Sequence, residues 1–299
     1  MSEASRPRGA TASDDGGLGT VAPALFVVLW ATGFVVARLA MPHAPPLGFL
    51  ALRFAATLLA LAPLIRLARA PWPDRRTAGH VAVAGLMIHA AYLAGVWASI
   101  AAGMSAGVVA LIVNLQPVLT AIWMALGTER IGARRWLGLA LGFGGVALVV
   151  AHRVGTEGLA PSSVALAALG LVAITAGTLY QRRYAPSFDL RTGSFVQYAA
   201  AFAATAPLAA VLEPDARWDW GAPLAFALVW SVFALSIGAV FLMYRLNRRG
   251  SATRVASLLY LVPPVTALQA WLLFDEPFGV REAVGMGLVA LGVALVVRR

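Results

Sequence analysis

Few side chains in this sequence could do chemistry, and most of those are neutral. His89 and Tyr92 lie three positions apart, while Asn114 and Gln116 precede Pro117. The other polar or aromatic candidates within apolar stretches are Trp30, Thr32, Tyr180, Tyr244 and Tyr260. These groups exchange hydrogen bonds and offer aromatic surface, but they form no nucleophile–base pair and no acidic or metal-binding cluster. They indicate binding of a small molecule, with no catalytic residue.

Carboxylates and cysteines, which would supply acid–base or metal chemistry, are missing from the middle of the apolar stretches. The 13 carboxylates fall in the first residues, in loops or at the ends of apolar stretches, and the chain has no cysteine. We therefore expect no metal site, no cofactor and no intramembrane protease or polyprenyl-processing site. Lysine is also absent, which excludes a retinal Schiff base.

Composition places these residues in a bilayer. Hydrophobic residues make up 60% of the 299 positions and charged residues 12%, and the mean hydropathy is +0.80. A soluble fold could not cover itself with so few polar groups. The net charge of +10 does not indicate nucleic-acid binding, because the arginines lie between apolar runs. The expected partners are the lipid bilayer and a small-molecule substrate, with no nucleic acid.

Ten segments approach the roughly 20 apolar residues that span a bilayer as a helix. A polar tail, residues 1–19, precedes them and is expected to be disordered and cytoplasmic. The predicted segments are Thr20–Met41, Leu47–Ala68, Ala78–Ala101, Met104–Leu126, Arg135–Ala151, Pro161–Arg182, Thr192–Leu212, Ala222–Arg245, Ala252–Phe274 and Val280–Val297. The runs lack the strict alternation of a membrane barrel, so the expected fold is an all-α integral membrane protein.

Arginine placement predicts the orientation. Arginines cluster after the second, fourth, sixth, eighth and tenth segments, whereas the alternate loops are neutral or acidic. By the positive-inside rule both termini are cytoplasmic, which an even number of spans requires. The arginine-only, Ala- and Gly-rich composition is typical of a GC-rich bacterium, so the predicted location is the inner (plasma) membrane as a multi-pass protein.

The chain repeats itself. GVALVV occurs at Gly145–Val150 and again at Gly292–Val297, and the offset of 147 extends the match upstream to Gly103. The 48 aligned positions contain 17 identities, too many for two unrelated apolar stretches. FAAT recurs as well, at offset 148. We therefore predict two five-helix repeats, residues 20–151 and 161–299. Because five is odd, the copies should be inverted with respect to each other.

Both halves resemble the EamA domain of the drug/metabolite transporter superfamily. The similar stretches are VNLQPVLTAIWMALGTERIGARRWLGLALGFGGVALVV and LYLVPPVTALQAWLLFDEPFGVREAVGMGLVALGVALVV, with LWATGFVVARLA and PPLGFLALRF near the start. In that family a helix with a central Pro leads to a Glu and then to a Gly-rich helix. ITAGTLYQRRY departs from the usual Trp-containing sixth helix, so no contact there is carried over. The resemblance implies a ten-helix inverted repeat and metabolite export, including aromatic amino acids.

Prolines and helical periodicity refine the candidate site. Pro117, Pro263 and Pro264 each remove a backbone hydrogen bond, so they are predicted hinges in the fourth and ninth segments. His89 and Tyr92 should share one helix face, which Val96 and Ser99 continue. Asn114 and Gln116 should point about 200° apart, so at most one would face a central cavity.

Several polar residues have two interpretations. Arg53 could snorkel to the outer surface or pair with a substrate carboxylate, and snorkelling is the safer prediction. Gln116 and Gln269 could form interhelical hydrogen bonds instead of binding a solute. Glu129 and Glu276 should interact with Arg134 and Arg281 or with exposed amides. Trp residues at segment ends are predicted membrane-interface anchors, and the glycines of the fifth and tenth segments should allow close packing.

The preferred function is export of small metabolites, amino acids or related amphipathic solutes, by alternating access through a central cavity. The alternatives are an uptake carrier or facilitator for another metabolite or drug, and proton-coupled drug efflux. The lack of a carboxylate in mid-segment favours movement down a gradient, or coupling through His89. The protein could be a monomer or a homodimer.

Overall fold

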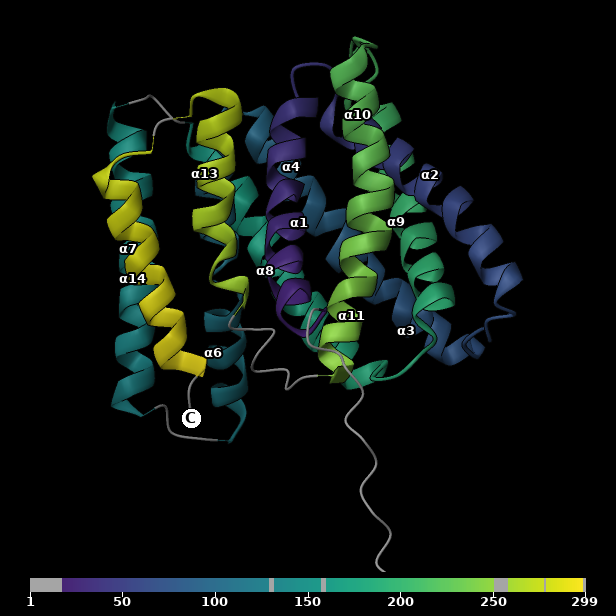
Figure 1. Ribbon diagram of the computed structural model, residues 1–299, viewed down its shortest axis with the longest axis horizontal. Coiled ribbons are helices and arrows are strands. Elements are labelled where there is room, and N and C mark those ends of the chain that lie inside the picture. Colours follow the sequence, from purple (N-terminus) through teal and green to yellow (C-terminus); the bar gives the residue numbers. More distant parts are fainter. Residues whose placement is uncertain (1–17, 129–131, 157–159, 250–257, 277, 298–299) are drawn as a thin grey trace, which may run out of the picture.

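The computed structural model describes residues 18–128, 132–156, 160–249, 258–276 and 278–297, and every regular element in these ranges is a helix. In chain order the elements are α1 Leu18–Ala40, α2 Pro46–Leu67, α3 Arg75–Gly85, η1 Leu86–Ala91, α4 Tyr92–Ala101, α5 Ala106–Val113, α6 Gln116–Thr128, α7 Ala133–Thr156, α8 Pro161–Tyr184, α9 Leu190–Leu212, α10 Ala222–Trp230, η2 Ser231–Ala239, α11 Val240–Arg249, α13 Val262–Phe274 and α14 Val280–Val297. The helices stand side by side in one bundle (Figure 1). The η elements are π-helical segments that continue their neighbours.

The described helices have the length and composition of membrane spans. Six are long and apolar enough to cross a bilayer, and three shorter apolar helices accompany them, a count that covers the described residues. Each of the ten predicted segments overlaps a helix. The six are Val21–Ala40, Pro46–Leu67, Arg75–Ala101, Pro161–Tyr184, Leu190–Leu212 and Ala222–Met243. The chain is a multi-pass, all-helical membrane protein.

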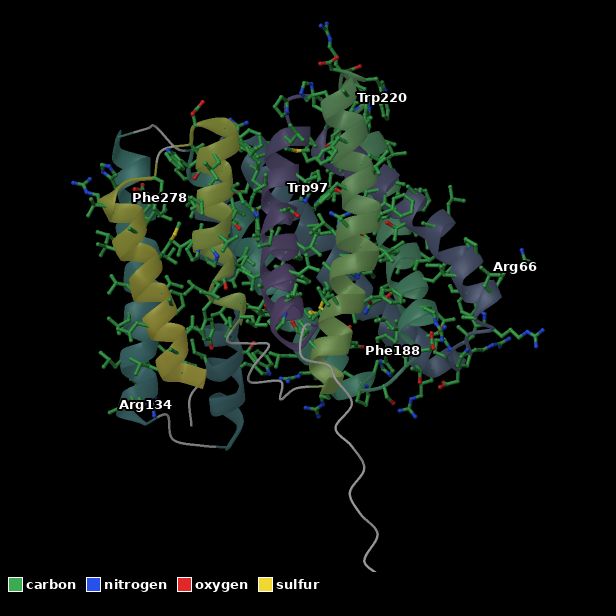
Figure 2. All side chains as sticks on the ribbon, viewed as in Figure 1. Arg66, Trp97, Arg134, Phe188, Trp220 and Phe278 are labelled. Carbon is green, nitrogen blue, oxygen red and sulfur yellow. The ribbon has the colours of Figure 1, made fainter. Side chains whose placement is uncertain are left out.

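Side-chain exposure fits a lipid environment. Large apolar side chains lie exposed on the outer faces of the helices, including Leu59, Leu67, Phe233 and Leu272. Hydrocarbon accommodates such faces, whereas water would not. Arg134 and Phe188 lie toward the lower end of the bundle and Trp220 at its upper end (Figure 2). The largest fully buried side chains, which form the core, are Trp97, Tyr198, Phe26, Phe49 and Phe54.

Helices α7 and α14, which carry the two GVALVV copies, pack directly on each other, at the left of Figure 1. A Cβ at Gly138 would lie 2.6 Å from the backbone oxygen of Gly292, and one at Gly145 would lie 2.6 Å from that of Gly285. Any larger residue would collide with backbone, so the glycines set the distance between these helices. The prediction of glycine-mediated close packing is confirmed.

Hydrogen-bonded side chains begin two helices at the lower end of the bundle. Asp74 precedes α3 and Asp189 precedes α9, and each carboxylate accepts hydrogen bonds from the first backbone amides of its helix. The Thr77 hydroxyl, which donates to Asp74 at 2.6 Å, holds the pKa of that carboxyl below its usual range. Hydrogen bonds from the Arg191 side chain lower the pKa of Asp189. Both helices therefore start from an ionised cap.

Carboxylates also fix helix ends at the upper end of the bundle. Glu213 accepts hydrogen bonds from the backbone amides of Leu47 and Gly48, at 3.0 and 2.8 Å, in the first turn of α2. Glu276 forms an ion pair with Arg38 at 3.2 Å and accepts a longer hydrogen bond from the amide of Ala106. Glu276 was expected to interact with Arg281 or with exposed amides. It does contact the amide of Ala106, but the arginine part of the prediction was wrong, because its partner is Arg38 and Arg281 contacts His152.

Some predictions concern residues outside the described ranges. Of the predicted tail, residues 1–17 are outside them, while Leu18 and Gly19 already belong to α1. Glu129 also lies outside the described residues, as do residues 252–257 at the start of the ninth predicted segment.

Candidate functional site

A break in the fourth predicted segment creates the centre of the candidate site. The segment was expected to be one kinked helix, but α5 ends at Val113, Asn114 and Leu115 form a turn, and α6 begins at Gln116. Pro117 is thus the second residue of a new helix, where its missing N–H leaves no hydrogen bond unmade. Pro263 and Pro264 occupy the first turn of α13 in the same way. All three prolines lie at helix starts instead of mid-helix kinks.

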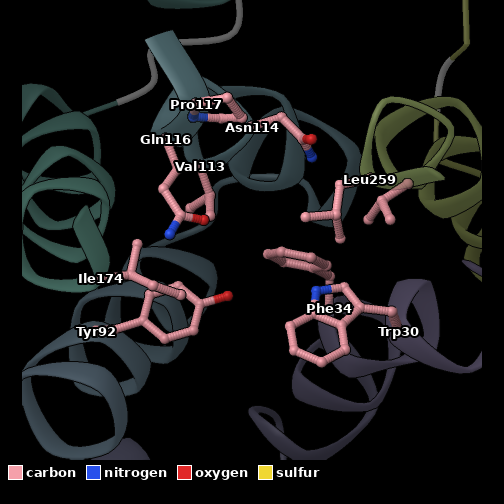
Figure 3. A pocket seen from close by; sticks show the side chains of 10 residues that line it. Trp30, Phe34, Tyr92, Val113, Asn114, Gln116, Pro117, Ile174 and Leu259 are labelled. Atoms are coloured by element: carbon pink, nitrogen blue, oxygen red, sulfur yellow. The ribbon is translucent and has the colours of Figure 1, made fainter. Parts of the chain in front are cut away.

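The turn opens onto a cavity of about 40 Å³, which we call the central cavity (Figure 3). Both Asn114 and Gln116 line it, because the turn between them removes the continuous helix that would have pointed them apart. The expectation that at most one could face a cavity was therefore wrong. The other lining residues are Trp30, Phe34, Tyr92, Val113, Pro117, Ile174, Leu259 and Val262.

The polar atoms of the central cavity are partly committed. Asn114 Nδ2 donates to the backbone oxygen of Ala110 at 3.1 Å, and Gln116 Nε2 donates to Thr178 Oγ1 on α8 at 2.9 Å. Among the described residues, no donor reaches the carbonyl oxygen of either amide. The Tyr92 hydroxyl points into the same space (Figure 3). A solute in the cavity would meet two amide acceptors and one phenol between aromatic walls.

A second cavity of about 80 Å³ adjoins the first, and we call it the arginine cavity. It shares Trp30, Phe34 and Tyr92 with the central cavity and adds Arg53. The remaining lining residues are Gly33, Leu93, Val96, Trp97 and Leu235. Both volumes fall below the roughly 300 Å³ of an ordinary ligand pocket, so their walls must separate before a metabolite can enter.

Arg53 does not snorkel. Its side chain is buried, with 6% exposed. Nε and Nη2 donate to Ser236 Oγ on η2 at 3.3 and 3.2 Å, and the guanidinium lies 5.9 Å from the ring centre of Trp97. The predicted outward orientation was wrong, because the side chain turns from α2 toward the π-helical segment in the protein interior.

His89 belongs to a neighbouring polar cluster and lines neither cavity. Its Nε2 lies 3.3 Å from Gln197 Oε1, and its ring stacks on Tyr198 at 4.3 Å between centroids. Since Gln197 uses its own N–H to donate to Gln181 at 2.7 Å, its oxygen accepts from His89. Tyr198 in turn donates to the backbone oxygen of Ser236 at 3.5 Å. The cluster thus joins α8, η1, α9 and η2.

The π-helical turn η1 separates residues that were expected on one face. Tyr92 and Val96 line the arginine cavity, whereas His89 faces α9. Ser99 Oγ donates to the backbone oxygen of Ser163 on α8 at 2.8 Å. A π-helical turn contains more residues than an α-helical turn, so spacing of three no longer keeps two side chains together across η1.

The remaining predicted residues contact other helices. Thr32 accepts from Trp230 Nε1 at 2.9 Å, and Tyr260 donates to the backbone oxygen of Val293 at 3.4 Å. Tyr180 shares a hydrogen bond of 2.8 Å with His80 Nδ1. Tyr244 lies on α11, and its side chain is outside the described part of the structure. Trp30, Tyr92, Asn114 and Gln116 are therefore the predicted residues that the structure brings together.

A third and larger space, about 480 Å³, lies between α6, η1 and α8. We call it the lower groove, because it includes Arg183 and Tyr184 near the lower end of α8. Thr175 and Leu119 line it, and each is close in sequence to a residue that lines the central cavity. The hydrogen bond between Gln116 and Thr178 joins α6 to α8, the two α-helices that line both the central cavity and the lower groove.

Within the described ranges, no group of three or more His, Cys, Asp or Glu side chains is placed so that it could hold a metal ion. Sequence reasoning also missed several site residues. Phe34 follows Trp30 by four positions, so helical periodicity could have indicated it. Ser236 and Tyr198 gave no such signal, because their roles depend on the contact between distant segments.

Comparison with known proteins adds an independent line of information. The sequence profile described as the EamA-like transporter family matches twice, at residues 18–151 and 161–298. An "uncharacterized transporter YvbV" of Bacillus subtilis is 26% identical over 91% of this chain and 89% of its own length. A "probable amino-acid metabolite efflux pump" of Escherichia coli is 26% identical over 90% of this chain and 91% of its own length.

A solved structure, titled only "Crystal structure of protein", has a similar fold. Its TM-score is 0.64 at 22% sequence identity, and the similarity covers 92% of this chain and 95% of that one. The helical arrangement described above is therefore one that an experimentally determined protein also adopts.

Proposed function

Because the chain belongs to the EamA-like transporter family, we propose that it exports small amphipathic metabolites, amino acids in particular, through the central cavity. The observation that carries this proposal is the cavity at the α5–α6 break, where Trp30 and Tyr92 meet Asn114 and Gln116. Ile174 and Leu259, from the other half of the chain, complete its wall. The name of the E. coli relative supports both the direction of transport and the substrate class.

The lining matches the chemistry of such a solute. Aromatic rings and aliphatic side chains can bury an apolar group. The unoccupied amide oxygens of Asn114 and Gln116 can accept hydrogen bonds from an ammonium group. Trp30, Tyr92, Asn114 and Gln116 are the residues of this proposed site, whereas Tyr180 lines the lower groove and His89 lines neither the central nor the arginine cavity.

The proposed architecture is ten spans in two inverted five-helix repeats, residues 20–151 and 161–299. The two family matches support this division. The glycine contacts support the inversion. At the offset of 147, Gly285 is the counterpart of Gly138 and Gly145 is the counterpart of Gly292. Gly138 contacts Gly292, and the two counterparts, Gly285 and Gly145, contact each other in the same way. Such reciprocity is expected of two antiparallel copies related by a pseudo-two-fold axis. The π-helical segments η1 and η2 also recur at nearly this offset.

Alternating access would move the solute. The central and arginine cavities are smaller than a metabolite, so each transport step must separate helices on one side of them. The helix starts at Pro117, Pro263 and Pro264 are the proposed hinges, since a chain that already lacks continuous helical hydrogen bonding bends there at little cost.

Orientation and energetics complete the proposal. Arginine-rich loops at the lower end support a cytoplasmic location for that end and for both termini, in a bacterial inner membrane. The described carboxylates that make hydrogen bonds do so at helix ends, as Glu213 and Glu276 illustrate. We therefore propose transport down a substrate gradient, without proton coupling.

Reconstitution in proteoliposomes tests this function. Purified protein should accelerate the efflux of labelled amino acids relative to empty liposomes, and an imposed pH gradient should not drive uphill accumulation. Tyr92→Ala should slow the flux at least tenfold by removing a cavity wall. Phe233→Ala, which removes an exposed aromatic ring, is the matched control and should transport normally. No flux across a broad amino-acid panel would refute the proposal.

A further inference from the structure

Arg53 is a positive charge inside the membrane protein. It lies seven residues after the start of α2, about 10 Å along the helix. A guanidinium remains protonated in proteins, so this side chain is charged even when buried. Removing an ion from water costs several kcal/mol unless a partner compensates for the lost hydration. A counter-charge is therefore required, and its source needs to be found.

The described protein does not supply that counter-charge. Ion pairs among the described residues join Arg38 to Glu276, His43 to Asp219, and Arg191 to Asp189, all near helix ends. Arg53 forms none of them, and its hydrogen-bond acceptor is a neutral hydroxyl. Of the five guanidinium N–H groups, two donate to Ser236 Oγ. The other three have no acceptor in the described part of the chain.

Those donors border space that a solute can reach. Arg53 lines the arginine cavity, which shares Trp30, Phe34 and Tyr92 with the central cavity. Trp97 lies beside the guanidinium and stacks on Phe49 at 4.7 Å, so the ring cannot easily move away. The contact with Ser236 fixes the other edge of the group. The charge is therefore held in place next to an aromatic wall.

The duplicated scaffold does not need this charge. With the offset of 148 that aligns the two FAAT stretches, Arg53 corresponds to Ala201. Ala201 is fully buried on α9, and α9 packs against α2. At the matching position of the other copy, the fold is therefore formed with a small apolar residue and without a charge. A cation present in one copy alone is better explained by a ligand than by the fold.

We infer that Arg53 and Ser236 form a subsite that binds the carboxylate of the transported solute. This rests on the proposed function and names its substrate class: amphipathic solutes with one carboxylate, whose apolar part lies against Trp30, Phe34 and Tyr92. A guanidinium pairs with a carboxylate through two parallel hydrogen bonds. One cation neutralises one carboxylate, whereas a phosphate monoester would bring nearly two negative charges.

Competition for binding tests the subsite on the unmodified protein. Labelled phenylalanine is bound to the detergent-purified chain and displaced by unlabelled phenylalanine, phenylalaninamide, 3-phenylpropionate or phenyl phosphate. Phenylalanine should compete about tenfold better than phenylalaninamide, because a charge-assisted hydrogen-bond pair is lost with the amide. 3-Phenylpropionate keeps the carboxylate but lacks the ammonium group, so it should compete less well than phenylalanine. Equal competition by acid and amide, or preferred competition by phenyl phosphate, would overturn the inference. If labelled amino acids of the panel neither bind nor cross, the proposed function itself fails, and the subsite with it.

Variants separate the charge from the surrounding structure. Arg53→Gln should reduce the acid-to-amide ratio toward one, and Arg53→Lys should keep part of it. Ser236→Ala retains the cation but removes the hydroxyl that holds it, so it should weaken the preference for the acid less than Arg53→Gln does. Arg66→Gln, an exposed arginine on the same helix, is the matched control and should behave as wild type. Because a ratio is compared within each protein, partial loss of folded material does not affect it. An unchanged ratio in Arg53→Gln would overturn the inference while leaving transport intact.

Discussion

Replacing Gly292 with alanine would put a methyl group at the closest approach of α14 to α7. A Cβ at Gly292 would lie 2.5 Å from the backbone oxygen of Gly138 and 2.6 Å from the backbone nitrogen of Gly142. Neither atom can rotate away, because both belong to a helix backbone. Ordinary van der Waals contact begins at 3.4 Å. The helices must therefore separate by about 1 Å.

The expected cost follows from that separation. Overpacking of a close-packed interface typically costs about 1–3 kcal/mol. For a chain of this length each kcal/mol lowers Tm by about 2 °C, so Gly292→Ala should lower Tm by roughly 2–6 °C. Gly145 occupies the corresponding position of the first repeat and faces the backbone oxygen of Gly285 at 2.6 Å. Gly145→Ala should have a similar cost.

Thermal unfolding of the detergent-solubilised protein measures this effect. Gly287→Ala is the matched control on α14, because a Cβ there meets nothing within 4 Å. Its Tm should stay equal or rise, since alanine is the better helix former by about 1 kcal/mol. If Gly292→Ala melts at the same temperature as Gly287→Ala, the two helices do not pack through these glycines and the reasoning is refuted.

Three further predictions concern single contacts. Asp189→Asn should lower Tm at pH 7. Hydrogen bonds from Arg191 lower the pKa of Asp189 in the folded chain below its ordinary value of 3.8. The ionised carboxylate therefore stabilises the fold above pH 3.8, and this stabilisation is lost as the pH falls through the pKa of the folded chain. The difference from wild type should therefore shrink in melts below pH 4, and a constant difference would contradict it. Glu213→Ala should lower stability by about 1 kcal/mol in the same assay, because two amides of the first turn of α2 lose their acceptor; no change would exclude this capping role. Thr178→Val should reduce stability by about 0.6 kcal/mol and raise the Km of transport severalfold. The cause is that the Gln116 amide loses the acceptor that orients it. An unaltered Km would remove Gln116 from the site.

Hydropathy and spacing predicted the positions of the helices well. Spans are long apolar runs whose ends coincide with charges, so Pro46–Leu67 and Pro161–Tyr184 fell within a residue or two of prediction. The glycines of α7 and α14 were also identified correctly, because repeated small residues in a membrane helix have few roles other than close packing.

The errors arose where local backbone geometry departs from the α-helix. Treating Met104–Leu126 as continuous separated Asn114 from Gln116, although the turn between them lets both line one cavity. No sequence pattern indicated the π-helical turn η1, so His89 was predicted to lie on the same helix face as Tyr92. Arg53 was judged by its distance from the end of α2, whereas its orientation depends on Ser236, 183 residues away. Such tertiary contacts are not encoded in the periodicity of one segment.

The most direct test of transport through the central cavity uses the absence of native cysteine. Asn114→Cys places one thiol in the cavity wall, and membrane-impermeant maleimide is applied to one side of oriented proteoliposomes at a time. Alternating access predicts labelling from either side, slowed by a transported amino acid in both cases. Labelling from one side alone, or labelling that substrate does not slow, would contradict the account.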